Sequence, residues 1–316
     1  MNPETNFPET LTEAVVYFSD PENAHNFMVG LRWAKGVTCP CCGSSDVRPI
    51  PTRRTWECKS VHPKRQFSVK VGTIFEDSPL PLSKWLATIW LIANAKNGIS
   101  SYEVHRAIKV TQKTAWFMLH RIRLAMQTGT FEKLKGDVEV DETFIGGKSA
   151  NKHVGRKTRG TGPMNMTAVV GLLERGTNGG HSKIVARVAR SRRKADLQAD
   201  VLSTVEPGSF VATDALKSYE GLSQTYIHEF IDHAVTYVRG KVHTNGLENF
   251  WSLLKRTLKG TYVSVDPVHL MRYLDEQVFR FNNRKTDDAS RFLLAAVAIV
   301  GKRLTYRELI SNPATL

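Results

Sequence analysis

The chain has 316 residues, 41% of them hydrophobic, which is enough for two or three domains with buried cores. Its 44 Lys and Arg residues against 30 Asp and Glu residues give a formal net charge of +14, which favours a polyanionic partner such as nucleic acid over a role in solubility alone. The acidic, polar start and the lack of an apolar run long enough to cross a bilayer argue against a secreted or membrane protein and predict a cytoplasmic one.

Residues 1–36 are predicted to form a helical lead-in. Apolar side chains recur there at nearly helical spacing. They are Phe18, Phe27, Met28, Leu31 and Trp33.

Residues 37–78 are predicted to form a zinc ribbon with short strands at 46–50, 55–58 and 66–71. Zinc takes four sulfur or nitrogen ligands in a tetrahedron, which two knuckles on adjacent hairpins supply. The predicted ligands of one structural Zn²⁺ are Cys39, Cys42, Cys58 and His62. Val61 stands where a fourth cysteine would be expected, and Cys41 is the alternative ligand. The basic residues of the ribbon favour DNA contact over the alternative, docking on protein.

Residues 79–130 are predicted to form a helix-turn-helix domain. The helices span 83–96, then 101–108 after a capping box that joins Ser100 and Glu103, and then a longer segment that Thr111 caps. A short helix, a tight turn and a longer helix are typical of DNA-binding modules. The side chains predicted to meet base edges are Gln112, Lys113 and Thr114. A plain layer of a helical bundle is the alternative.

Residues 136–300 are predicted to form a catalytic domain. Strands are expected at 137–145, 166–174, 182–189 and 209–214, with a helix at 192–205 before the last of them. Asp141 stands in mid-strand, where carboxylates are disfavoured, and Asp214 ends the fourth strand. Carboxylates on one side of a sheet suit Mg²⁺ or Mn²⁺. The alternative for Asp214 is a helix N-cap. Asp137, Glu139 and Glu142 are interpreted as solvated or structural, and the alternative for Glu142 is a place beside the metal ligands.

A basic, glycine-rich segment follows the first strand, at residues 148–162. Such a composition suits contact with a phosphate backbone. The residues predicted to contact DNA there are Lys148, Lys152, Arg156 and Lys157.

The stretch 243–260 is predicted to be a helix with an apolar stripe and a polar stripe. Thr244 or Asn245 would cap its start. Leu247, Trp251, Leu254 and Leu258 make the apolar stripe, and Asn245, Glu248, Ser252, Lys255 and Lys259 make the polar one. Glu248 is the only carboxylate of the polar stripe, so we predict that it completes a metal site with Asp141 and Asp214. The order of strands and helices is that of a ribonuclease-H-like core, whose two metal ions would act on a phosphodiester.

Six segments together resemble the DDE transposases of bacterial insertion sequences, in the group that carries a zinc ribbon ahead of a ribonuclease-H-like domain. The segments are CPCCG, QFSVKVGTIFEDSPLPLSKW, VDETFIGGK, ATDALKSY, HTNGLENFWSLLKRTLKGTY and YLDEQVFRFNNR, and the resemblance runs from about Phe18 to Phe292. It implies Mg²⁺-dependent cleavage and strand transfer at the ends of the element, without a covalent enzyme–DNA intermediate.

The resemblance also implies roles for individual residues. Asp141 and Asp214 match the first two acids of the family, Glu248 matches the third, and Lys255 matches the lysine seven positions later. In this group asparagine or histidine can replace the third acid, so Asn245 and His243 are alternatives. The spacing of Glu248 and Lys255 favours Glu248.

We therefore expect an α+β, multi-domain protein: a zinc ribbon, a helix-turn-helix domain, a ribonuclease-H-like domain with a mixed sheet flanked by helices, and a tail at 301–316. The expected cofactors are two Mg²⁺ or Mn²⁺ ions and one Zn²⁺, without a small-molecule cofactor. The expected partner is double-stranded DNA, both element ends and target, bound by a homodimer or larger assembly at the bacterial nucleoid. The alternatives are a catalytically silent DNA-binding protein and a nuclease that cleaves without joining.

Overall fold

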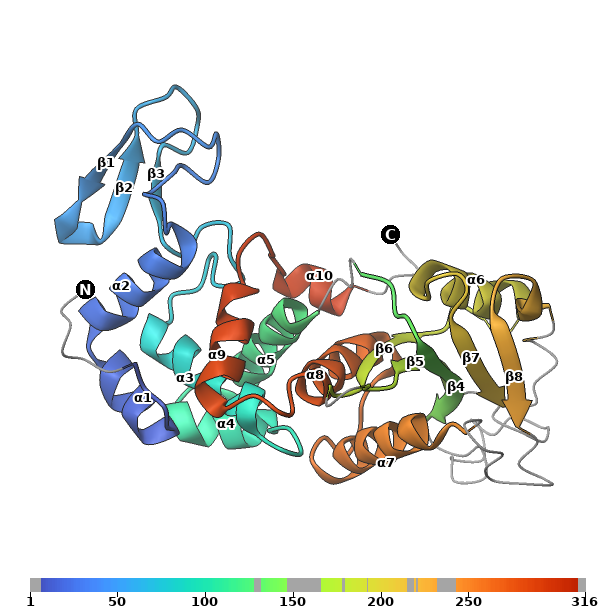
Figure 1. The fold of residues 1–316 in the computed structure, drawn as a ribbon. Coiled ribbons are helices and arrows are strands. Elements are labelled where there is room, and N and C mark those ends of the chain that lie inside the picture. The colour runs from blue at the N-terminus through green and yellow to red at the C-terminus, as the bar shows by residue number, and fades with distance from the viewer. Residues whose placement is uncertain are drawn as a thin grey trace. The chain divides into compact units, whose positions relative to one another are not determined.

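The computed structural model describes residues 7–127, 132–146, 166–177, 180–191, 193–214, 219, 221–231 and 243–311. The chain forms two compact units (Figure 1), one made of residues 1–127 together with 286–316, and one made of residues 128–285. Within the described ranges, no helix is long and apolar enough to cross a membrane.

The first unit begins with two helices and a small antiparallel sheet. The helices are α1 (Leu11–Ser19) and α2 (Pro21–Arg32), and the strands are β1 (Val47–Ile50), β2 (Thr55–Cys58) and β3 (Gln66–Ser68), in the order β1-β2-β3. Trp56 of β2 stacks on His25 of α2 and meets the edge of Trp33. These aromatic contacts fix the small sheet on the helical lead-in.

Three helices follow the small sheet: α3 (Leu82–Asn94), α4 (Ser101–Ile108) and α5 (Gln112–Met126). The predicted capping box is confirmed, since the Ser100 hydroxyl accepts from the Glu103 amide and the Glu103 carboxylate accepts from the Ser100 amide. The predicted cap of the third helix is also confirmed, because the Thr111 hydroxyl accepts from the Thr114 amide. Short local signals were enough to place these helices.

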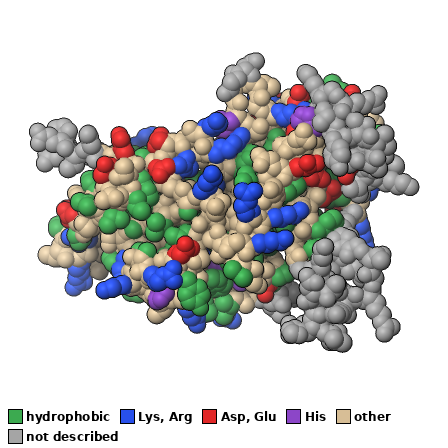
Figure 2. All heavy atoms as spheres, turned by 90° about the horizontal axis from the view of Figure 1, so that it is seen from below, with side chains coloured by type: hydrophobic (Ala, Val, Ile, Leu, Met, Phe, Trp, Pro, Cys, Tyr) green, Lys and Arg blue, Asp and Glu red, His purple; other side chains and the backbone are tan. Residues whose placement is uncertain are grey.

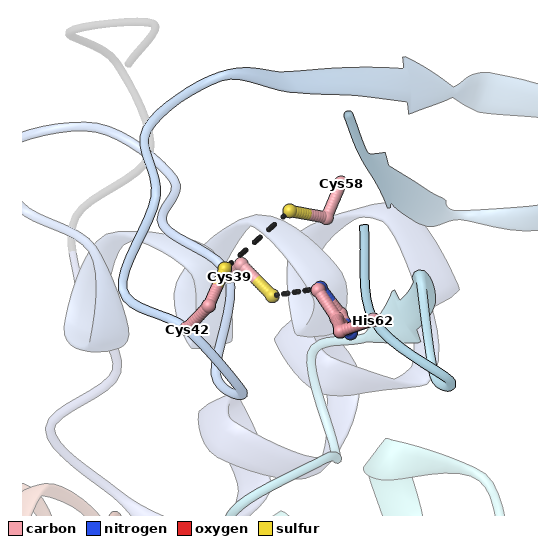
Figure 3. A group of neighbouring side chains, drawn as sticks. All are labelled: Cys39, Cys42, Cys58 and His62. Atoms are coloured by element: carbon pink, nitrogen blue, oxygen red, sulfur yellow. Dashed lines mark hydrogen bonds between the residues drawn. The ribbon is translucent and has the colours of Figure 1, made fainter. Parts of the chain in front are cut away.

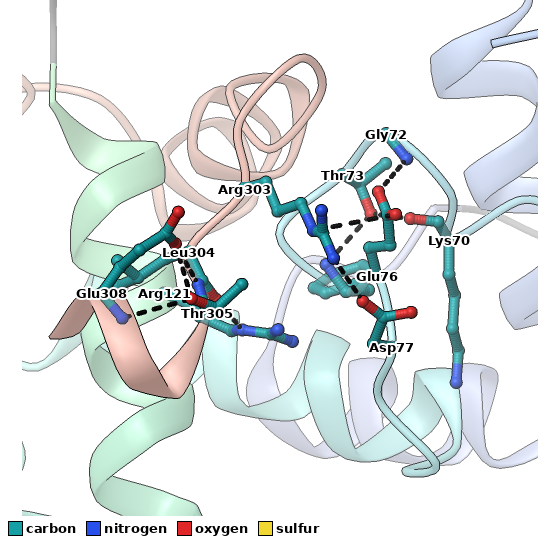
Figure 4. A network of polar contacts seen from close by, with 11 residues as sticks. Lys70, Gly72, Thr73, Glu76, Asp77, Arg121, Arg303, Leu304, Thr305 and Glu308 are labelled. Atoms are coloured by element: carbon teal, nitrogen blue, oxygen red, sulfur yellow. Dashed lines mark hydrogen bonds and ion pairs between the residues drawn. The ribbon is translucent and has the colours of Figure 1, made fainter. Parts of the chain in front are cut away.

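The C-terminal residues return to the first unit. They form α9 (Asp288–Val297), which packs on α3, and α10 (Tyr306–Ile310). Figure 4 shows the contacts of the intervening segment: Arg303 Nη2 donates to Asp77 Oδ2 at 2.6 Å, and Arg121 Nε donates to the Leu304 carbonyl at 2.9 Å. Lys302 donates to three carbonyls at the end of α5. The domain boundaries at 300 and 301 remain a prediction.

The second unit contains a five-stranded mixed sheet in the order β6-β5-β4-β7-β8. Its strands are β4 (Asp137–Ile145), β5 (Thr167–Glu174), β6 (Lys183–Val188), β7 (Phe210–Asp214) and β8 (Ile227–Ile231). Its helices are α6 (Lys194–Thr204), α7 (Asn245–Gly260) and α8 (Leu270–Asn282). β5 pairs antiparallel with β4 and with β6, whereas β7 pairs parallel with β4 and with β8.

Helices cover both faces of this sheet (Figure 1). On one face, Val138 and Val140 of β4 join a buried core with Leu197 and Val201 of α6. The opposite face packs against α7 and α8. Because side chains alternate along a strand, Asp141 points to the α7 face while its neighbour Val140 points to α6.

Four strands, α6 and α7 lie within a few residues of their predicted positions, and the mixed α/β architecture is confirmed. The fifth strand, β8, was not predicted. At the opposite edge of the sheet, the Asn282 side chain accepts from the Ile184 amide and donates to the Ile184 carbonyl. The Asn282 side chain therefore pairs with the open edge of β6, where another strand could otherwise bind.

Candidate metal centres and active site

Four ligand side chains converge in the small sheet of the first unit (Figure 3). Their ligand atoms all lie within 4.8 Å of one another: Cys39, Cys42, Cys58 and His62. Cys39 Sγ lies 3.4 Å from His62 Nε2, and Cys42 Sγ lies 3.6 Å from Cys58 Sγ. A tetrahedral zinc ion with ordinary bond lengths separates its ligand atoms by about 3.5–3.8 Å. The arrangement therefore supports a structural Zn²⁺.

Cys41 lies outside this cluster. Its thiol is exposed, as is that of Cys42, but only Cys42 belongs to the set whose ligand atoms lie within 4.8 Å of one another. The geometry thus separates the four predicted ligands from the alternative one.

Asp141 and Asp214 are neighbours on adjacent parallel strands. The register pairs Val140 with Thr213, so the next residue on each strand is an aspartate. Adjacent strands lie about 4.8 Å apart. Phe210 and Ala212 alternate with Val211, which faces α6, so Asp214 lies on the α7 face with Asp141.

Helix α7 lies very close to β4 and β5. A Cβ atom on Gly171, which pairs with Asp141 across the two strands, would come within 2.6–2.7 Å of the Trp251 ring and 2.8 Å of Leu247. Only glycine leaves room for the helix at this position. Because Gly171 of β5 has no side chain, the Trp251 ring reaches the neighbouring strand β4, where its Nε1 donates to Asp141 Oδ2 at 2.9 Å. The helix is therefore joined directly to the first predicted acid.

Glu248 lies on the same edge of α7 as Trp251. It precedes Trp251 by one helical turn, Lys255 follows by one turn, and both charged side chains are exposed. At about 100° per residue, Glu248 lies about 60° around the helix from Trp251, whereas Asn245 lies about 120° away. Among these polar residues of α7, Glu248 is thus better placed than Asn245 to approach Asp141.

The pKa of Asp141 is raised to about 6, mainly by burial and in smaller part by the negative charges of Asp214 and Glu248, while the Trp251 hydrogen bond opposes the shift. Asp141 is therefore close enough to Asp214 and to Glu248 to be repelled by each of them. The oxygens of these three carboxylates are more widely spaced than the zinc ligands, because in the described part of the chain only the three cysteines and the histidine have ligand atoms that all lie within 4.8 Å of one another.

The chemistry of this donor set fits a divalent cation such as Mg²⁺, which binds carboxylate oxygens together with several waters. A cation between the carboxylates would offset their repulsion. Asp141, Asp214 and Glu248 are the residues that would hold it.

A fourth carboxylate, Glu142, lies behind this group on the α6 face. Tyr219, itself fully buried, donates a hydrogen bond to Glu142 Oε1. The pKa of Glu142 is raised to about 7, mainly by burial and in smaller part by the charges of Asp141 and Asp214, while the Tyr219 hydrogen bond opposes the shift. Glu142 is therefore a second carboxyl group with a raised pKa beside the site, on the side opposite α7.

The side chains predicted at the start of α5 make contacts within the first unit. Gln112 Nε2 donates to Ser101 Oγ at 2.8 Å, Lys113 Nζ lies 4.7 Å from the centre of the Tyr306 ring, and the Thr114 hydroxyl pairs with Thr111. Lys113 remains exposed, as does Lys259 on α7. The predicted DNA contacts Lys148, Lys152, Arg156 and Lys157 lie outside the described residues.

Two family models match the chain. The "ISXO2-like transposase domain" matches residues 133–282, and the "Transposase zinc-ribbon domain" matches residues 19–60. A Haemophilus influenzae protein named "Uncharacterized transposase-like protein" is 31% identical over 102 residues, which are 32% of this chain and 82% of that protein.

The chain belongs to this transposase family.

One further relative supports this family, whereas the similarity to a solved structure does not bear on it. A Halobacterium salinarum protein named "Uncharacterized protein in transposable element ISH50" is 28% identical to the transposase over 256 residues, 76% of this chain and 84% of that protein. A chain of the solved simian T-cell lymphotropic virus intasome with PP2A regulatory subunit B56 gamma shares 11% identity over 57% of this chain and 68% of its own length. Its TM-score of 0.28 is too low to bear on the fold.

Membership of the family implies that the transposase binds DNA. This agrees with its net charge of +14 and with the many Lys and Arg side chains on the face shown in Figure 2.

The sequence analysis missed three residues that shape the candidate site. Gly171 makes room for Trp251, the Trp251 indole holds Asp141, and Glu139 bonds to the first turn of α7. Of these three residues, only Glu139 could have been recognised from the sequence. It is an acid in the interior of a predicted strand, and it lies two positions before Asp141 and therefore on the same face.

We predict that Trp251→Phe lowers the rate of DNA cleavage by roughly tenfold, the lower end of the effect of removing a partner of a metal ligand. Phenylalanine keeps an aromatic ring over Gly171 but cannot donate to Asp141, so the pKa of Asp141 rises. The cleavage rate measured against pH should therefore reach its plateau at a higher pH than in the unchanged protein. Phe250→Leu, at a buried aromatic residue of the same helix, is the matched control and should leave this pH profile in place.

Proposed function

We propose that the transposase binds the terminal inverted repeats of its insertion sequence, cleaves them and joins the freed ends to target DNA. The observation that carries this proposal is the adjacency of Asp141 and Asp214 on parallel strands, with Glu248 on a helix that Trp251 joins to Asp141. The sheet order and its flanking helices support a ribonuclease-H-like catalytic domain for the second unit.

In this proposal Asp141, Asp214 and Glu248 hold two divalent ions, which activate the attacking water or 3′-hydroxyl and stabilise the leaving oxygen. Lys255 lies two helical turns beyond Glu248 on the same edge of α7, and its exposed ammonium would hold a DNA phosphate beside the acids. Lys259, one turn further, would extend this contact along the backbone.

DNA recognition is assigned to the first unit. α4 and α5 have the lengths and the tight connection of a helix-turn-helix, and the exposed Lys113 lies in the first turn of α5. Because an element has two ends, we also propose that two or more chains assemble on DNA. The zinc ribbon lies in the same unit, and we propose that its basic residues also contact DNA.

The test is an assay with Mg²⁺ on DNA that carries the repeats flanking the coding region. Cleaved and joined products should both form, and Glu248→Gln should abolish them while Asn245→Ala leaves them intact. The reverse outcome would assign the third metal position to Asn245. Cleavage without joined product would indicate a nuclease, and a bound complex without cleavage would indicate a silent DNA-binding protein.

A further inference from the structure

Glu139 is a buried carboxylate that the proposed chemistry does not use. Its side chain is 1% exposed and lies two residues before Asp141 in β4, so both point to the α7 face. Burying a carboxylate costs several kcal/mol unless its oxygens are paired. Both oxygens of Glu139 are paired: Oε1 with Arg175 Nε at 2.8 Å, and Oε2 with the backbone amide of Leu247 at 3.0 Å.

The second partner makes Glu139 the cap of α7. The first amides of a helix lack partners within the helix, and an N-cap side chain usually satisfies one of them. The predicted caps do not do so here, because the side chain of the N-cap residue Thr244 makes no capping bond and Asn245 is already inside the helix. A carboxylate from the sheet takes that place, where it also interacts favourably with the helix dipole.

Arg175 extends the same contact to the residue before the helix. Its Nη2 donates to the His243 carbonyl at 2.6 Å and lies 3.0 Å from His243 Nδ1. The same ring nitrogen lies 3.4 Å from Glu139 Oε1, so His243 joins the pair of Glu139 and Arg175. This contact gives His243 a structural role at the start of α7.

The contact connects two proposed acids by a very short path through the chain. Asp141 is two residues beyond Glu139, and Glu248 is one residue beyond Leu247. The fit leaves no free space, because a Cβ atom on Gly246 would come within 2.9 Å of Glu139 Oε2 and 3.1 Å of Leu173. Any shift of the first turn of α7 therefore moves Glu248 relative to Asp141.

We propose that Glu139, together with Arg175, is a positioning residue of the active site, which sets the separation of Glu248 from Asp141 and thereby the affinity for the divalent cation. This proposal rests on the proposed function, because it takes those acids as metal ligands. A contribution to stability alone does not explain the buried pair of Glu139 and Arg175, since well-packed apolar residues of similar volume often make a protein as stable as a buried ion pair does.

The test measures Mn²⁺ binding to the full-length, zinc-loaded protein without DNA, by calorimetry and by the electron paramagnetic resonance signal of free Mn²⁺. Glu139→Gln keeps the shape of the side chain and removes its charge. We expect its dissociation constant for Mn²⁺ to rise by about tenfold, as for other partners of metal ligands. Circular dichroism at the same temperature checks that the variant is folded.

The matched control is Glu276→Gln. Glu276 is a buried acid of a different helix: it is 0% exposed in α8, pairs with Arg280 and accepts from Tyr262 at 2.6 Å. Its loss should lower stability and leave Mn²⁺ affinity unchanged. Equal weakening by both variants would show a general effect of destabilisation and would overturn the positioning role.

Gly246→Ala tests the same contact from the helix side and serves if Glu139→Gln does not fold. Alanine favours a helix but displaces the Glu139 carboxylate, so Mn²⁺ affinity should fall even if stability does not. Asp141→Asn separates the two proposals. If it leaves Mn²⁺ binding intact, the metal site itself is wrong; if it abolishes binding while Glu139→Gln and Gly246→Ala bind normally, only the positioning role is wrong.

Discussion

Asp141→Asn should abolish DNA cleavage while leaving DNA binding and the fold intact. A metal ion stabilises the transition state by several kcal/mol, so losing its central ligand should slow cleavage by roughly 10³-fold or more. The fold should tolerate the change because the asparagine carbonyl can still accept from Trp251 Nε1, which lies 2.9 Å from Asp141 Oδ2. Rates are measured under single-turnover conditions, with DNA affinity followed by gel shift.

The matched control is Asp137→Asn, on the same strand and face but four residues from Asp141. It should cleave at the normal rate. Equal losses in both variants, or full activity in Asp141→Asn, would contradict the proposed site.

Asp141→Asn should also change the stability of the protein, in a way that depends on pH. Folding raises the pKa of Asp141 from 3.8 to about 6, so the folded state disfavours the ionised form. The cost, up to about 3 kcal/mol, is fully present above pH 6, shrinks as the pH falls towards 4 and is absent below it. Without added Mg²⁺ or Mn²⁺, Asp141→Asn should therefore be more stable than the unchanged protein at pH 8 and equally stable below pH 4. Urea denaturation at both pH values measures this difference.

Local patterns in the sequence were enough to predict most elements and the three acids. The mid-strand carboxylate and the end of the fourth strand marked Asp141 and Asp214. The two stripes of 243–260 predicted α7, and its apolar stripe is indeed buried, with Leu247 and Leu254 fully so. Each of these signals lies within one element, where the periods of strand and helix make the burial pattern readable.

The sequence could not predict what depends on contacts between distant segments. β8 gains its strand conformation by parallel pairing with β7, and its five residues carry no clear alternation of their own. The need for glycine at position 171 follows only from its contact with Trp251, 80 positions later in the sequence. Likewise, α9 belongs with α3 because the chain returns to its first unit after the sheet. Local patterns along the chain do not show that residues so far apart belong to one unit.

Removal of zinc should unfold the ribbon and lower the stability of the first unit. Structural zinc contributes on the order of 10 kcal/mol to small metal-dependent domains, more than the ribbon's small core can replace. That core is Cys39, Cys58 and Phe67 with a few partly buried neighbours, including Trp33 and Trp56. We therefore expect Cys58→Ser to lose the one bound zinc per chain and to expose both tryptophans, seen as a red shift of fluorescence.

Two further variants make this prediction specific to the four ligands. Cys41→Ser changes an exposed thiol outside the cluster, so zinc content and fluorescence should stay as they are. His62→Cys supplies a thiolate near the position of His62 Nε2, which lies 3.4 Å from Cys39 Sγ, and sets of four cysteine ligands are ordinary structural zinc sites. It should therefore retain zinc, whereas His62→Ala should lose most of it. Zinc loss in Cys41→Ser, or full zinc content in His62→Ala, would show that Cys41 rather than His62 is the fourth ligand.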